Sequence, residues 1–152
     1  MLTVKQFSFN PFSENTYLLI NEESKKCWII DPGMYGHDET VILTNYITDQ
    51  GLIPQQIINT HTHIDHIFGV DAIKDKYQIP FGVHQKDMPV LENAVGSAMM
   101  FGFSFRVAPQ PDFFIADNSV LQLDDEQLEV RFAPGHSPGS IVFYYAKGGF
   151  VI

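Results

Sequence analysis

The chain has 152 residues, with 18 Asp and Glu against 9 Lys and Arg, and a formal net charge of −9 at pH 7. With 45% apolar and 13% aromatic residues it can bury a core, which excludes disorder as its main state. The acidic balance excludes non-specific binding to nucleic acid or to an anionic membrane surface, because both need clustered cations.

The first third of the chain predicts three strands. Apolar residues nearly alternate over residues 2–9, and two apolar runs, 17–20 and 27–30, flank a polar turn at 21–24. Two short runs around a tight polar turn predict an antiparallel hairpin. Asp31-Pro32-Gly33 then ends the third strand.

The middle of the chain predicts alternating helices and strands. A helix begins at Asp38 as N-cap and ends before Gly51, which fits the C′ position. Hydrophobic periodicity then predicts a strand, a helix, a strand and a short helix over residues 57–60, 66–77, 80–83 and 86–95. This order is typical of a βαβ-type layer.

The last third of the chain predicts a second set of strands, over residues 120–123, 128–132, 141–145 and 150–152. Polar Glu129 and Arg131 alternate with apolar neighbours, so one face of this sheet is expected to be solvated. Residues 97–118 are irregular and too apolar for a linker, which predicts a packed loop. Within that loop, the Met- and Phe-rich stretch 99–105 is expected to be core or interface rather than a substrate wall.

The length fits one domain, spanning residues 1–152. No apolar run approaches 18 residues, and the first seven residues lack a basic stretch followed by an apolar one, so neither a membrane span nor a signal peptide is predicted. The single cysteine, Cys27, cannot form an internal disulfide and is expected to be a small core residue. A reducing, cytoplasmic setting follows.

Three of the six histidines lie in one hexapeptide, His61-Thr-His63-Ile-Asp65-His66. Residues two apart on an extended segment point to the same side, so His61 and His63 are expected to face one metal ion at the end of the strand before them. Asp65 and His66 lie past the turn and face an adjacent position. This one segment can therefore provide ligands for two metal positions. It follows the end of a strand, which is where binding sites gather in layered α/β folds.

His136 is the candidate third ligand of the first ion. It lies in Pro-Gly-His-Ser-Pro-Gly, where two prolines and two glycines fix the backbone around one imidazole after a strand. Nitrogen and carboxylate donors suit zinc first, with iron or manganese as alternatives. Three histidines leave a fourth position open for water, whose pKa zinc lowers to about 7.

These motifs resemble those of the metallo-β-lactamase-fold hydrolases, and within them the glyoxalase II (hydroxyacylglutathione hydrolase) group. Asn15-Thr-Tyr17 and Asp31-Pro-Gly33 also match elements that such proteins carry before the metal motif. The resemblance covers the whole chain and implies an αββα sandwich of the α+β class. It implies His61, His63 and His136 on the first metal, with Asp65 and His66 on the second.

The family pattern continues into a Gly-Asp pair, whose aspartate bridges the metals, and a later histidine. Neither follows in this chain, which ends at Ile152. The sequence is therefore expected to be the N-terminal portion of a longer hydrolase, with the second half of the sandwich incomplete. A free sheet edge would then favour homodimerisation.

Three functions stay open at this point. The first is a zinc-dependent hydrolase of thioester or ester substrates, in which a metal-bound hydroxide attacks the carbonyl and Asp65 holds the nucleophile. The second is an iron-dependent persulfide dioxygenase of the same fold, with lactonase or β-lactamase activity a lesser alternative. The third is an inactive fragment that binds little or no metal.

Four residues have readings other than metal ligation. Asp65 is alternatively the N-cap of the helix that follows it. Asp31 either serves turn chemistry or orients a ligating histidine. His84 is expected to be a partly buried or loop histidine, and His37 a surface residue near the first helix.

Overall fold

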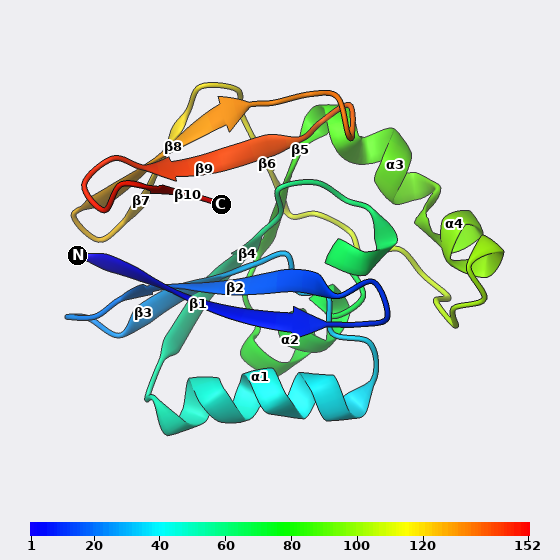
Figure 1. Cartoon of the computed structure of the whole chain (residues 1–152), viewed down its shortest axis with the longest axis horizontal. Coiled ribbons are helices and arrows are strands. Elements are labelled where there is room, and N and C mark those ends of the chain that lie inside the picture. The colour runs from blue at the N-terminus through cyan, green and yellow to red at the C-terminus, as the bar shows by residue number, and fades with distance from the viewer.

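Two β-sheets and four helices make up the computed structural model, which describes residues 1–152 (Figure 1). The larger sheet has the order β1 (Leu2–Phe9), β2 (Glu14–Asn21), β3 (Lys26–Ile30), β4 (Ile53–Ile58), β5 (Phe81–His84) and β6 (Phe113–Ile115). The smaller sheet has the order β10 (Phe150–Val151), β9 (Ile141–Tyr145), β8 (Glu126–Phe132) and β7 (Val120–Leu123). The helices are α1 (His37–Asp49), α2 (Val70–Tyr77), α3 (Met88–Glu92) and α4 (Ala94–Met100).

The elements form layers. Figure 1 shows α1 on one side of the larger sheet, the smaller sheet on the other, and α3 and α4 beyond one edge. Strands β1 to β3 are antiparallel, as predicted for the hairpin, and β3 to β6 are parallel. The α+β sandwich is confirmed, with a helix layer on the larger sheet and none over the outer face of the smaller sheet.

Both faces of the larger sheet are buried at its strands β2 and β3. In β2, Leu18 faces the helix-side core, whereas Leu19 faces the core between the sheets. Ile29 and Ile30 divide in the same way in β3. Because successive strand residues point to opposite faces, a sheet covered on both sides needs continuous apolar runs, which is how these strands read in the sequence.

The smaller sheet has one solvated face. In β8, Leu128 and Val130 are buried while Glu129 and Arg131 are exposed, as predicted. Arg131 pairs with Glu129 at 2.9 Å and lies over the ring of Tyr144, so the outer face is held by polar contacts. Homodimerisation through a sheet edge stays a prediction.

Helix α1 begins differently from its prediction. Its N-cap is Gly36, and Asp38 lies in the first turn, so Asp38 as N-cap is wrong. Gly36 has a φ of 93°, which residues with a Cβ rarely adopt, and this turn sets the helix start. Gly51 has a φ of 62° after the C-cap, which confirms its predicted position.

The predicted helix 66–77 is two elements, a 3₁₀ turn over Ile64–His66 and helix α2. Asp65 therefore does not cap a helix. Gly69 separates the two elements: its N–H donates to the Pro32 carbonyl at 2.8 Å, and a Cβ there would lie 2.9 Å from the same oxygen. This close approach of two backbone segments keeps the first turn apart from α2.

Three other boundaries differ. Strand β4 begins at Ile53, ahead of the predicted 57–60. The strand can include Pro54 because this residue lies near its start, where the missing backbone N–H of proline is tolerated. The predicted helix 86–95 is a 3₁₀ turn at Gln85–Asp87, then α3 and α4, which extend to Met100. The segment predicted as a loop, 97–118, contains β6.

Strand β6 has three residues, too few to show periodicity in the sequence. It pairs in parallel with β5. A Cβ at Gly82 would lie 2.3 Å from the Phe113 ring, so the glycine in β5 makes room for that side chain. No helix of the structure is both long and apolar enough to cross a membrane.

Candidate metal centre

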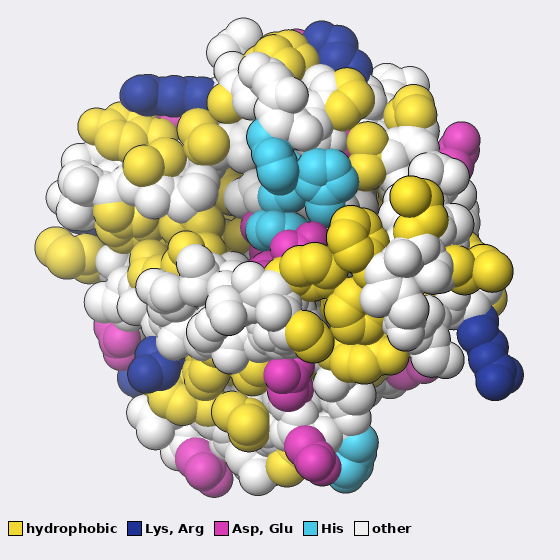
Figure 2. All heavy atoms as spheres, turned by 45° about the vertical axis from the view of Figure 1, so that its right-hand side comes forward, with side chains coloured by type: hydrophobic (Ala, Val, Ile, Leu, Met, Phe, Trp, Pro, Cys, Tyr) yellow, Lys and Arg dark blue, Asp and Glu magenta, His cyan; other side chains and the backbone are white.

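Three imidazoles from two separate segments meet at one edge of the larger sheet. Ligand nitrogens of His61, His63 and His136 all lie within 4.8 Å of one another. Their ring centroids are 4.6 to 4.8 Å apart, and His63 Nδ1 lies 3.0 Å from His136 Nε2. His61 is buried and His136 is exposed, so the group opens to solvent on one side (Figure 2).

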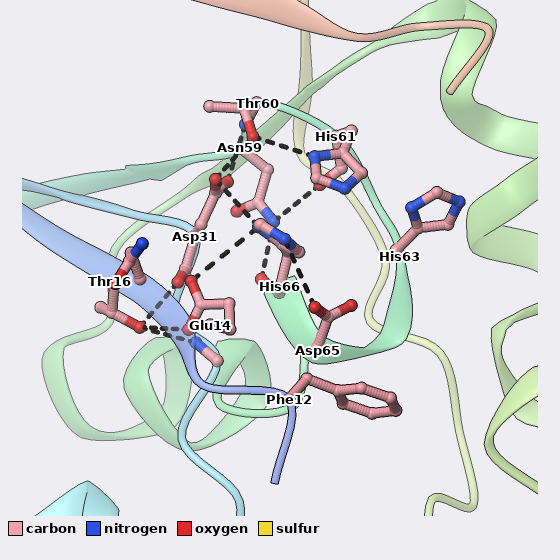
Figure 3. Close-up of polar contacts among 12 residues, drawn as sticks. Phe12, Glu14, Thr16, Asp31, Asn59, Thr60, His61, His63, Asp65 and His66 are labelled. Carbon is pink, nitrogen blue, oxygen red and sulfur yellow. Dashed lines mark hydrogen bonds and ion pairs between the residues drawn. The ribbon is translucent and has the colours of Figure 1, made fainter. Parts of the chain in front are cut away.

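The loop after β4 is held in shape by two polar side chains (Figure 3). Asp31 accepts hydrogen bonds from the Thr60 backbone N–H at 2.7 Å and from its hydroxyl at 2.6 Å. Asn59 donates to the carbonyls of His61 at 3.2 Å and His66 at 2.8 Å. The backbone that presents the histidines is therefore fixed from within the protein.

His66 faces a second, more buried group. Its Nδ1 lies 3.1 Å from Asp31 Oδ2 and 3.8 Å from Glu14 Oε1, and its Nε2 lies 3.5 Å from Asp65 Oδ2. Asp31, His61 and His66 offer ligand atoms within 4.8 Å of one another. Asp31 thus follows the end of β3 and contacts His66, and its role in orienting a ligating histidine stays a prediction.

Asp87 joins the two histidine-bearing loops and was not singled out in the sequence. Its carboxylate accepts from the Thr62 backbone N–H at 2.5 Å, the Thr62 hydroxyl at 2.8 Å and the Gly139 N–H at 2.9 Å, and from the Ser137 hydroxyl. Asp87 is fully buried. Its place just after β5 was the available signal, since loops after parallel strands meet at one sheet edge.

The electrostatics of the loop suit a cation. Burial lowers the pKa of His61 to about 4, and neighbouring His66 adds to this, so the imidazole is neutral at pH 7 and offers a lone pair. Burial, followed by His136, also lowers the pKa of His63. His61 Nε2 is buried without a hydrogen-bond partner. A buried nitrogen without a partner costs stability, and a metal ion would satisfy it.

Of the remaining candidates, His37 lies at the surface and Cys27 in the core, as expected, whereas His84 is buried in β5 and not partly buried or in a loop. Asp65 is half-buried beside His66. His84 is buried at the end of β5 and pairs with Asp117, away from both groups, and His37 is exposed at the start of α1. Cys27 is buried. The metal-ligand roles of His61, His63, Asp65, His66 and His136 stay predictions.

Glu14 is the most perturbed acid of the site. Burial raises its pKa to about 10, and the adjacent Asp31 adds to the rise. The folded protein keeps a proton that the unfolded chain releases above pH 4.5, so this group makes stability fall as pH rises from 4.5 to 10. Its side chain is fully buried.

We therefore expect Glu14→Gln to be more stable than the parent protein at pH 8, because the amide needs no proton. The difference should grow by up to about 1.4 kcal/mol per pH unit between pH 5 and 8. Urea unfolding in the presence of a chelator measures it. Glu23→Gln, at an exposed turn, should show no such trend, and a pH-independent difference for Glu14→Gln would contradict the prediction.

Comparison with known proteins gives a consistent result. A family model described as the metallo-beta-lactamase superfamily matches residues 9–152. The probable metallo-hydrolase YqgX of Bacillus subtilis is 35% identical over 150 residues, 97% of this chain and 68% of that protein. Hydroxyacylglutathione hydrolase GloC of Haemophilus influenzae is 32% identical over 134 residues, 87% of this chain and 61% of that protein.

Solved structures agree. The BLEG-1 B3 metallo-beta-lactamase has a TM-score of 0.85 at 33% identity, over 98% of this chain and 70% of that one. TTHA1623 in a di-iron-bound form has a TM-score of 0.81 at 31% identity, over 97% of this chain and 69% of that one. The chain spans about two thirds of the length of these proteins.

Proposed function

Since the chain belongs to the metallo-β-lactamase superfamily, we propose that it acts as a zinc-dependent hydrolase of thioester or ester substrates. The convergence of His61, His63 and His136 is the observation that carries this proposal. The similarity to a hydroxyacylglutathione hydrolase favours thioesters over other carbonyl substrates. The free, buried Cys27 fits a reducing, cytoplasmic setting.

Each site residue has a role in this proposal. His61, His63 and His136 would hold the first ion, and when bound, zinc supplies a Lewis acid and an activated water at neutral pH. Asp65 carries a carboxylate beside His63 on the wall of the adjoining cavity, where an Oδ atom can accept a proton from a water molecule. His136, exposed, leaves access for the substrate.

A second ion would be held by Asp65 and His66, as the resemblance implies. Asp31 contacts His66 Nδ1 and also fixes Thr60, so it would orient this ligand and the loop together. Partners of this kind fix the ring orientation of a ligating histidine. The family's bridging aspartate and last histidine have no counterpart in these residues.

Iron chemistry is the second candidate, favoured by the di-iron form of the similar protein TTHA1623. The same nitrogen and carboxylate donors suit iron. A persulfide dioxygenase would contain iron after purification and consume oxygen with glutathione persulfide. Zinc content without oxygen uptake would exclude it.

Chelation tests the main proposal. The purified protein is expected to lose nearly all thioester hydrolysis after treatment with a chelator and to regain it with zinc, because the nucleophile depends on the ion. Magnesium, which prefers oxygen ligands, serves as the control and should not restore activity. Hydrolysis that survives complete metal removal would refute the proposal. A protein that binds no zinc and hydrolyses nothing would match the inactive fragment.

A further inference from the structure

A cavity of about 360 Å³ adjoins the histidine cluster. His63 and Asp65 lie at one end of it, and its walls are largely apolar, built from Phe12, Val90, Ala94 and Phe101. These walls come from the β1–β2 loop and from α3, α4 and the residue after α4. Figure 2 shows hydrophobic side chains bordering the histidines on this face.

The rim of the cavity is aromatic. Phe12 and Phe101 are 43% and 62% exposed, yet their rings meet edge to face at 5.4 Å. Phe103 also contacts Phe12 at 5.4 Å and packs against the main core. Large apolar side chains left exposed at the mouth of a cavity are typical of a ligand site.

The apolar walls of the cavity offer no basic side chain to an anion. No lysine or arginine lines the cavity. Six of the nine basic residues of the chain pair with carboxylates elsewhere: Lys25, Lys26, Lys74, Lys86, Arg131 and Lys147. A carboxylate at the far end of the acyl group would lie unpaired among the apolar walls, which is costly.

We propose that this cavity binds the acyl group of the substrate, and that this group is uncharged and apolar. The inference rests on the proposed hydrolase function. An acyl group in this cavity would have its carbonyl end at His63 and Asp65, next to the proposed metal centre. The exposed side at His136 would then be free for the polar thiol part of the substrate. An apolar cavity of about 150 Å³ holds benzene, so this one accepts a phenyl ring or a six-carbon chain.

The substrate series that tests it keeps one neutral thiol, N-acetylcysteamine, and varies the acyl group. From acetyl to hexanoyl, kcat/KM is expected to rise about fourfold for each added methylene. Glutaryl, of similar length to hexanoyl but negatively charged, is expected to be hydrolysed at least tenfold more slowly than hexanoyl. Equal rates across the series, or a preference for glutaryl, would overturn the inference while leaving the hydrolase function intact.

A filled cavity provides the second test. Ser97 lines the cavity and is only half-buried, so Ser97→Phe should fill it without disturbing the core. We expect the hexanoyl-to-acetyl ratio of kcat/KM to fall about tenfold. Ser8→Phe, on the exposed edge strand β1, is the matched control and should keep the parental ratio. A parental ratio in Ser97→Phe would contradict the inference.

Binding to the metal-free protein separates the two proposals. Phenylacetamide, which needs no catalysis, should bind with a negative heat-capacity change, and Ser97→Phe should weaken it about tenfold. If no thioester is hydrolysed but this binding is found, the hydrolase proposal fails and the apolar site stands. If phenylacetamide does not bind to the metal-free parent protein, the cavity is not an apolar subsite.

Discussion

Replacing His136 by alanine is expected to weaken zinc binding about a hundredfold. Four-ligand zinc sites bind with about 10–16 kcal/mol, so an even share is roughly 3 kcal/mol per ligand. His136 is exposed, and its loop is held by Asp87 through Ser137 and Gly139, so the variant should keep its fold. Competition with a chromophoric chelator gives the affinity, and circular dichroism checks the fold.

His37 provides the matched control for this experiment, because it is exposed like His136, whereas His84 is buried. His37 lies at the start of α1, and His84 pairs with Asp117. His37→Ala is expected to bind zinc as the parent protein does. If His136→Ala bound zinc as tightly as His37→Ala, the three-histidine centre would be wrong, and with it the proposed hydrolase.

Replacing Asp87 by alanine is expected to destabilise the protein by about 4 kcal/mol. The substitution leaves buried donors on Thr62, Ser137 and Gly139 without an acceptor, and each such group costs about 1–3 kcal/mol. Asp87→Asn keeps the shape but places an amide donor against other donors, so a smaller loss of about 2 kcal/mol is expected. Urea unfolding of the chelated proteins measures both.

Asp87→Asn also tests whether this carboxylate supports the metal centre. Because Asp87 holds the loops of His63 and His136 together, Asp87→Asn is expected to lower zinc affinity about 10–100-fold, as loss of a supporting partner does. Asp75→Asn, an exposed change on α2, is the control for charge alone. An Asp87→Asn protein that is destabilised but binds zinc normally would show that the contact serves the fold only.

The pH dependence of this effect has a definite sign. Burial opposes ionisation of Asp87, but hydrogen bonds from Ser137, Thr62 and Gly139 outweigh it and lower its pKa. The ionised form therefore stabilises the folded state above the pKa of the unfolded chain, near 3.8. The stability difference between the parent protein and Asp87→Asn should shrink as the pH falls below 4.

The sequence predicted the strands of the fold better than the starts of its helices. Strands 120–123 and 141–145 were located correctly from their apolar runs. The starts of α1 and α2 were not, because Gly36 takes its position from a turn and Gly69 from contact with the Pro32 carbonyl. Such contacts join residues that periodicity treats as separate.

The candidate site divides in the same way. His61 and His63 share one short segment, so their spacing and the residue types were enough to predict a metal motif. The partnership of Asp87 with Thr62 and Ser137 joins residues 25 and 50 positions apart, and no local pattern marks it. The apolar cavity is similar, since it exists only where the β1–β2 loop meets α4.

The sequence by itself determined the family, the layered class and the histidines that identify the chemistry, because ligand types at short spacing and strand periodicity are local properties. Only the tertiary structure decided that His136 reaches the other two rings, that one buried carboxylate joins their loops, and that a largely apolar cavity lies beside them. These features depend on which chain segments are brought together when two hydrophobic cores form on opposite faces of one sheet.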